Sequence, residues 1–248
     1  MKRRGRMPCL RSAALWLALL SLGACAGPPA APDPVAEGAI LAAGSELENF
    51  GILREKLLRY QASGEYDGQL AAAATEAARY LEGRPGDPGR GAIVLDIDET
   101  SLSNWPYLEA NQLARLHYGP CDLPQGPCGW PAWADMAAAT AIEPTLEIYR
   151  LAQEQGLAVF FITGRPESER AATERNLRQA GYGTWEQLYM QPDGATFPSA
   201  ADFKAPKRRE IEAQGYEIVL NMGDQESDLE GGYAERTFKL PNPFYWIP

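Results

Sequence analysis

The 248-residue sequence predicts an α/β fold: a doubly wound parallel sheet with a small cap insertion and N-terminal helices. From residue 91 onward, apolar β-type stretches alternate with helical patterns, which is typical of a parallel sheet. Polar residues follow these apolar stretches, and such sheets bind ligands at the carboxyl ends of their strands. With 45% hydrophobic residues, the chain is long enough to bury one sizeable core.

The elements follow from hydrophobic periodicity and from glycine and proline positions. Helical patterns cover about 45–61 and 66–81, and a stretch rich in glycine and proline over 83–91 ends them. Segment 101–140 is too long for a plain connection and carries five Trp and Tyr residues, so we interpret it as an irregular cap beside the ligand site. A satellite aromatic core without substrate contact is the alternative. In chain order, we expect strand 92–97, helix 144–155, strand 157–162, helix 167–180, a strand near 187–190, helix 206–214, strand 217–222 and a strand near 236–240.

The N-terminal segment has the features of an export signal. Basic residues precede an apolar run over 13–22, which is too short to span a bilayer. Residues 22–25 (LGAC) resemble the lipobox of bacterial lipoproteins, which implies cleavage before Cys25, lipidation of Cys25 and, with Ala26 following, an outer-membrane anchor facing the periplasm or cell surface. An ordinary secretory peptide is the alternative. We therefore expect a signal peptide over 1–24, a tether over 25–44 and a folded domain over 45–248.

Charge and cysteine usage agree with export. Residues 1–24 hold five basic and no acidic residues, so their removal moves the formal net charge from −10 to −15. Such a chain has no general attraction for nucleic-acid polymers. Once Cys9 is cleaved off and Cys25 is lipidated, only Cys121 and Cys128 remain, and we expect them to form a disulfide in an oxidising compartment. A metal site is the alternative, but no second Cys or His pair completes it.

Acidic residues follow two of the expected strands. Asp96 and Asp98 end the apolar stretch 92–97 and begin on the same side of it, because side chains two apart in a strand share a face. Asp224 and Asp228 follow strand 217–222. Carboxylates that converge at one sheet edge repel one another unless a cation lies among them, and Mg²⁺ prefers such oxygen ligands. The sequence therefore predicts a magnesium site formed by these four residues.

A hydroxyl and a glycine end the strand expected over 157–162. Thr163 places its hydroxyl at the strand end, Gly164 permits an unusual turn, and Pro166 suits the first position of the next helix. Backbone N–H groups at that helix start, with the Thr163 hydroxyl, form a phosphate seat. A plain turn with a capping threonine is the alternative.

Positive charge is concentrated in segment 203–209 of this acidic chain. We expect one lysine there, Lys204 or Lys207, to reach the site and to bind an anion. Arg208 and Arg209 are expected on a solvated face.

These segments resemble the haloacid dehalogenase (HAD) superfamily and, more narrowly, its acid phosphatase branch, which includes exported and lipoprotein phosphatases of bacteria and the plant vegetative storage proteins. The resemblance implies a HAD-like (Rossmannoid) sheet from about residue 45 to the end. The matching segments are 96–104 (DIDETSLSN), 161–165 (FITGR), 215–219 (GYEIV), 223–229 (GDQESDL) and 236–245 (RTFKLPNPFY).

The resemblance implies a chemical role for each acidic residue. Asp96 would attack phosphorus and become an aspartyl phosphate. Asp98 would protonate the departing oxygen and then deprotonate the attacking water. Mg²⁺ would be held by the Asp96 carboxylate, the Asp98 backbone carbonyl and Asp224, with Asp228 close by or bound through water.

The resemblance also implies how phosphate is bound. Thr163 would hydrogen-bond the phosphoryl oxygens, and Lys204, with Lys207 in reserve, would contact both nucleophile and phosphate. The expected activity is Mg²⁺-dependent hydrolysis of phosphate monoesters, and the aromatic insertion points to 5′-nucleotides as substrates. Phosphotransfer to an alcohol and a non-catalytic surface lipoprotein of the same fold remain alternatives.

Overall fold

The computed structural model describes residues 47–84 and 89–248. The unit discussed below is Glu48–Pro248. The expected signal peptide and the whole expected tether, including Cys25, lie outside the described residues. Within those residues, no helix combines the length and apolar character needed to cross a bilayer.

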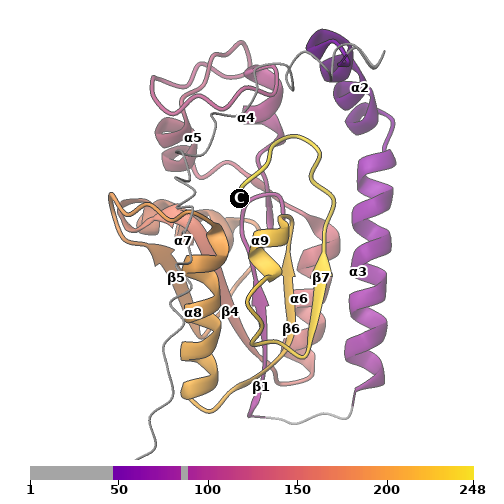
Figure 1. Ribbon diagram of the computed structural model, residues 1–248, viewed down its shortest axis with the longest axis vertical. Helices are drawn as coiled ribbons and strands as arrows, with labels where there is room; N and C mark the ends of the chain where they lie inside the picture. Colours follow the sequence, from indigo (N-terminus) through magenta and orange to yellow (C-terminus); the bar gives the residue numbers. More distant parts are fainter. Residues whose placement is uncertain (1–46, 85–88) are drawn as a thin grey trace, which may run out of the picture. The chain divides into compact units, whose positions relative to one another are not determined.

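The central sheet contains five parallel strands in the order β5-β4-β1-β6-β7 (Figure 1). Strand β1 lies in the middle and is buried along its whole length, which explains its continuous apolar sequence. The predicted doubly wound parallel sheet is confirmed. The strands of this sheet are β1 (Gly91–Leu95), β4 (Ala158–Pro166), β5 (Gln187–Gln191), β6 (Glu217–Gly223) and β7 (Arg236–Lys239).

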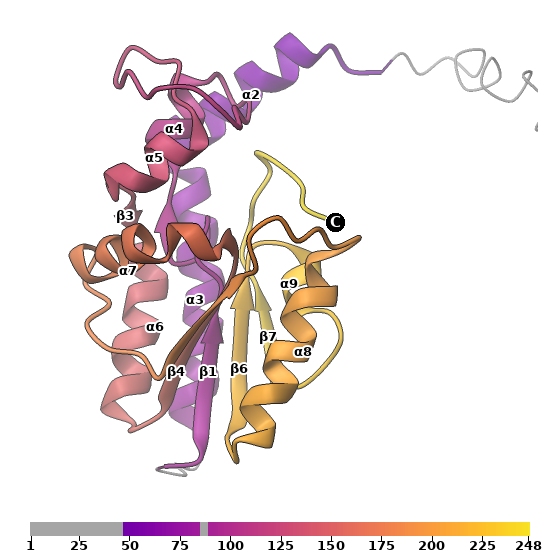
Figure 2. The same cartoon turned by 90° about the vertical axis from the view of Figure 1, so that its left-hand side faces the viewer.

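Helices cover both faces of the sheet (Figure 2). Ile93 and Leu95 belong to a core cluster with side chains of α3, α6 and α7. Ala92 and Val94 face the opposite cluster, which contains side chains of α8. The helical elements are α2 (Phe50–Ala62), α3 (Glu65–Gly83), α4 (Trp105–Ala110), α5 (Trp130–Met136), α6 (Glu143–Glu154), the 3₁₀ turn η1 (Glu167–Glu169), α7 (Arg170–Gln179), α8 (Ala200–Ala213) and α9 (Glu226–Leu229).

Helix α8 begins six residues before the expected start at 206. The Ser199 hydroxyl accepts a hydrogen bond from the Ala201 N–H (3.2 Å), and the Asp202 carboxylate accepts one from the Ser199 N–H (3.2 Å). This capping box starts the helix, so Pro206 lies inside it rather than at its first position. Lys204 is therefore already within the helix and projects from a regular element.

The insertion between β1 and α6 is more ordered than the expected irregular segment. It contains α4 and α5, and the short antiparallel strands β2 (Leu102–Ser103) and β3 (Thr140–Ala141) pair at its base. A disulfide joins Cys121 to Cys128 in the loop between the helices. The helices escaped sequence analysis because elements of six or seven residues carry little periodic signal.

Candidate functional site

The candidate site is a cavity of about 270 Å³ at the carboxyl ends of the central strands. The residues after β1 and β6 and the last three residues of β4 line it, together with side chains from α8, the insertion and the C-terminal segment. This is the position at which a doubly wound sheet binds its ligand.

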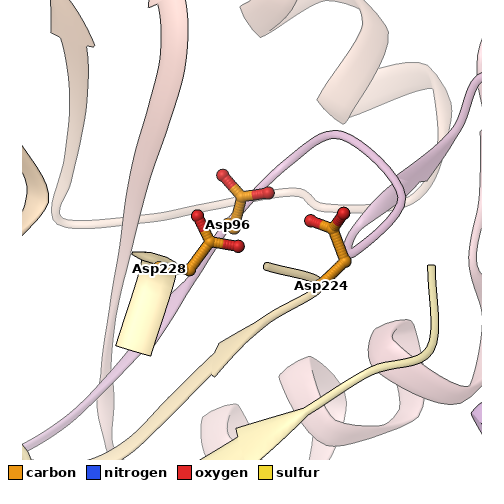
Figure 3. A group of neighbouring side chains, drawn as sticks. All are labelled: Asp96, Asp224 and Asp228. Atoms are coloured by element: carbon orange, nitrogen blue, oxygen red, sulfur yellow. The ribbon is translucent and has the colours of Figure 1, made fainter. Parts of the chain in front are cut away.

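Three aspartates converge in the site. Asp96, Asp224 and Asp228 each offer a carboxylate oxygen, and these oxygens lie within 4.8 Å of one another (Figure 3). Asp96 and Asp224 follow the adjacent strands β1 and β6, whereas Asp228 comes from the single turn α9. A Cβ atom at Gly223 would lie 2.4 Å from the Asp228 Cβ, so only glycine permits this approach. All three carboxylates are buried.

Lys204 lies among these acids. Its Nζ donates hydrogen bonds to the Asp228 Oδ1, at 2.6 Å, and to the Asp96 Oδ1. Burial opposes its charge, but the attraction of Asp228 and Asp96 outweighs burial and raises the pKa of Lys204. Lys204 is thus held as a cation against Asp96.

Burial also raises the pKa values of Asp96 and Asp224. It raises the pKa of Asp224 to about 7, and repulsion from Asp228 adds to this shift. The pKa of Asp96 is raised well above its ordinary value by burial, with Lys204 opposing the shift. A bound divalent cation would favour the ionised form of Asp96 and Asp224, and the three aspartates offer oxygen donors alone. The residues therefore fit a hard divalent metal ion.

Three side chains orient the Asp224 carboxylate by hydrogen bonds. Its Oδ2 accepts from the Gln225 Nε2 (2.6 Å) and the Asn242 Nδ2 (2.7 Å), and its Oδ1 accepts from the Thr100 hydroxyl (3.2 Å). Sequence reasoning gave Asn242 no role, although it lies in the quoted segment 236–245. The C-terminal segment therefore supports the proposed metal ligands.

The Asp98 carboxylate is paired with Arg165. Arg165 donates from Nη2 to Oδ1 at 2.6 Å and from Nε to both carboxylate oxygens at 3.1 Å. Asn104 Nδ2 donates to Oδ1 at 2.9 Å. Although burial raises the pKa of Asp98, the attraction of Arg165 outweighs burial and lowers the pKa. Sequence reasoning missed Arg165, although an arginine two residues beyond the strand-end Thr163 was a usable signal.

Thr163 and Gly164 lie where the sequence predicted, at the same edge of the sheet. Thr163 is buried and its hydroxyl accepts a hydrogen bond from the Arg165 N–H at 3.1 Å, while Gly164 lines the cavity. The expected helix 167–180 begins as η1, and the Ser168 N–H donates to the Asp193 Oδ1 at 2.8 Å. This amide is already satisfied, and phosphate binding by Thr163 and Gly164 stays a prediction.

The four basic residues of segment 203–209 have different locations in the structure. Lys207 pairs with Glu210 at 2.9 Å outside the cavity, so Lys204 is the lysine at the site. The expected solvated face is wrong for Arg208, which is fully buried, and Arg209 is exposed. Arg208 donates to the carbonyl oxygens of residues 228 (2.7 Å) and 232 (2.8 Å) and to that of residue 230, and so holds the chain around α9 in place.

The aromatic residues of the insertion serve different purposes. Trp130 and Tyr107 line the cavity, while Trp133 is buried and donates from Nε1 to the Asn104 Oδ1 at 2.8 Å. Tyr118 is exposed. From the C-terminal segment, Tyr245 also lines the cavity, and its hydroxyl donates to Glu99. Some rings of the insertion therefore line the cavity and others pack in the core, and substrate contact by the insertion stays a prediction.

Glu99 and Asn104 were also missed by sequence reasoning. Both line the cavity, and Glu99 accepts a hydrogen bond from the Asn104 N–H at 2.7 Å. Burial raises the pKa of Glu99 to about 7. Their place in the quoted segment 96–104 was the available signal.

Known proteins are similar to this chain in sequence and in fold. Residues 41–248 match the family model of the HAD superfamily, subfamily IIIB (acid phosphatase). The chain is 32% identical to acid phosphatase 1 of Solanum lycopersicum, over 76% of this chain and 72% of that protein. It is 32% identical to vegetative storage protein 1 of Arabidopsis thaliana, over 62% of this chain and 55% of that protein.

A solved structure agrees. The class C acid phosphatase from Bacillus anthracis superposes with a TM-score of 0.61 at 25% identity, and the match covers 76% of this chain and 83% of that one. The resemblance inferred from the motifs and the HAD-like sheet are confirmed, and the family activity is phosphomonoester hydrolysis. The chain belongs to the acid phosphatase family that forms subfamily IIIB of the HAD superfamily.

Proposed function

We propose that this acid phosphatase hydrolyses monoesters with Mg²⁺ and through an aspartyl phosphate on Asp96. The observation that carries the proposal is the convergence of Asp224, Asp228 and Lys204 on the Asp96 carboxylate. Phosphoryl transfer needs correct placement of the reacting groups and neutralisation of the negative charge on the phosphoryl oxygens. A cation held beside a buried carboxylate can orient the phosphate and neutralise its charge. The ion, held by Asp96, Asp224 and Asp228 with the Asp98 carbonyl, would neutralise the phosphoryl oxygens.

In the first step an oxygen of Asp96 bonds to phosphorus and the bond from phosphorus to the ester oxygen breaks. Asp98 gives a proton to the departing oxygen, and Lys204 and Thr163 hold the transferred group. In the second step Asp98 takes a proton from water, whose oxygen bonds to phosphorus and frees Asp96. Because Arg165 favours the ionised Asp98, this ion pair must loosen when substrate binds.

The direct test is phosphate release from a range of monoesters and metals, with Asp96→Asn as the inactive variant. Asp67→Asn, an exposed acid on α3, is the matched control and should retain full activity. Mass spectrometry of the enzyme stopped during turnover should show one added phosphoryl group on the peptide containing residue 96. Normal hydrolysis by Asp96→Asn would overturn the mechanism.

The proposed substrates are 5′-nucleotides. Trp130, Tyr107 and Tyr245 give one side of the cavity an aromatic lining, on which a nucleobase can stack. We expect a higher kcat/KM for 5′-nucleotides than for glycerol phosphate, and a smaller difference in Trp130→Ala. Equal turnover of both substrates would contradict base recognition.

Adding glycerol or a nucleoside as acceptor distinguishes hydrolysis from phosphotransfer. The free phosphate and the phosphorylated acceptor are measured together. Predominantly phosphorylated acceptor would make the protein a phosphotransferase.

For the location of the protein we propose export and lipid attachment at Cys25. The support is the sequence of residues 1–25, which lie outside the described part of the chain. Metabolic labelling with a fatty acid should mark the wild-type protein in the outer-membrane fraction, and Cys25→Ala should abolish the label. Unlabelled wild-type protein would contradict lipid attachment.

A further inference from the structure

Arg115 lies in the insertion after α4 and lines the same cavity as Asp96. Its guanidinium carbon lies 5.2 Å from the centre of the Trp130 ring and 5.9 Å from that of the Tyr245 ring. One ring comes from the insertion and the other from the C-terminal segment. Two distant parts of the chain therefore hold this cation at the cavity.

Among the described residues, two other cations line the cavity, and both form ion pairs with carboxylates. Arg165 is paired with Asp98, and Lys204 with Asp96 and Asp228. Within residues 47–84 and 89–248, Arg115 makes no side-chain hydrogen bond and no ion pair. Its contacts with the ring faces leave its N–H donors available, since a cation–π contact does not consume them.

The location of Arg115 separates its role from phosphoryl transfer. Arg165, which holds Asp98, also contacts Trp130, at 5.3 Å from the ring centre. Trp130 thus connects the reacting end of the cavity with the unpaired cation. A substrate whose phosphate lies at Asp96 would direct its leaving group toward the aromatic lining and Arg115.

We propose that Arg115 tightens the binding of any phosphate monoester whose leaving alcohol carries a second anionic group, a carboxylate or another phosphate, relative to the same ester without that group. A guanidinium recognises either group through paired hydrogen bonds. Because the described site is rich in aspartate, a second negative charge on the substrate would be repelled unless a cation such as Arg115 lay beside it. The inference rests on the proposed function in one respect, the placement of the substrate phosphate at Asp96.

Binding of non-hydrolysable phosphonates tests the proposal without turnover. The ligands are n-alkylphosphonates, ω-phosphonocarboxylates and α,ω-bisphosphonates of increasing chain length, titrated calorimetrically into the Mg²⁺-loaded protein. In the wild type, we expect a terminal carboxylate or phosphonate to tighten binding by about 10- to 100-fold at the best chain length, the range for hydrogen bonds to a charged group. The two anionic series identify which terminal group is preferred.

Arg115→Gln should remove this preference and leave alkylphosphonate affinity within about threefold, because surface substitutions have small effects elsewhere. Arg115→Lys keeps the charge and should retain part of the preference. Arg209→Gln changes the same charge at an exposed position of α8 and should behave as wild type.

Turnover gives a second measurement. The ratio of kcat/KM for 3-phosphoglycerate to that for glycerol phosphate should fall in Arg115→Gln by the same factor as the binding preference. The proposal is overturned if wild-type protein binds all series equally, or if Arg115→Gln weakens all of them equally. Absence of hydrolysis with intact selective binding would instead refute the proposed function alone.

Discussion

Lys204→Met removes the cation that contacts both Asp96 and Asp228 and keeps a side chain of similar length. Removing one partner of a buried ion pair destabilises a protein by about 3–5 kcal/mol. Because the pKa of Asp96 is already raised, this carboxylate can bind a proton in the variant and limit the loss. We therefore expect the free energy of unfolding without divalent cations to fall by about 3 kcal/mol, or roughly 6–12 °C in Tm for a domain of this size.

Thermal unfolding in chelator and in Mg²⁺ measures this effect. A ligand at 100 times its Kd stabilises a protein by about 2.7 kcal/mol. Mg²⁺ should raise the unfolding free energy of Lys204→Met by more than it raises that of a variant whose lysine is remote from the proposed metal site. Phosphatase activity should fall by about 10²- to 10³-fold, as for loss of one transition-state donor.

Lys207→Met is the matched control, because Lys207 lies on the same helix outside the cavity, pairs with exposed Glu210 and contacts the Tyr189 ring. Its unfolding free energy should stay within about 0.5 kcal/mol of the wild type. Equal stability of Lys204→Met and wild type in chelator would refute the electrostatic reasoning.

Three further variants test the scaffold of the site. Asn242→Ala loses the hydrogen bond to Asp224 and should lower Mg²⁺ affinity by about 10- to 100-fold. Metal titration of activity measures this affinity, and an unchanged value would contradict the supporting role of Asn242. Arg208→Met leaves three carbonyl oxygens without their donor and should lower the free energy of unfolding by at least about 3 kcal/mol. The control Arg209→Met, at an exposed position, should have little effect. Equal unfolding free energies of the two variants in chemical denaturation would refute the scaffold role of Arg208. Gly223→Ala forces Asp228 away and should reduce both Mg²⁺ affinity and kcat, so a fully active variant would show that this close approach is dispensable.

The sequence determined the sheet and the position of its strands, because burial of a strand leaves an apolar run that can be read locally. Strand β4 continues to Pro166, four residues beyond its expected end. Asp96 and Asp224 were placed correctly at one sheet edge, since parallel strands bring their carboxyl ends together. The start of α8 was placed six residues too late because the capping box at Ser199 and Asp202 was overlooked. That error was avoidable, since the capping signal is local.

The tertiary structure decided contacts that no local pattern predicts. The family resemblance implied that Lys204 contacts Asp96, and the structure chose it over Lys207. Asp98 and Arg165 are 67 residues apart, and their pairing depends on how complete strands and helices pack. Arg208 illustrates the same limit, because its burial depends on carbonyl groups of a loop that no local pattern links to α8. Hydrophobic periodicity indicates whether a face of an element is buried, but not which other element packs against it. The pKa values in this site depend on which charged side chains that packing brings together.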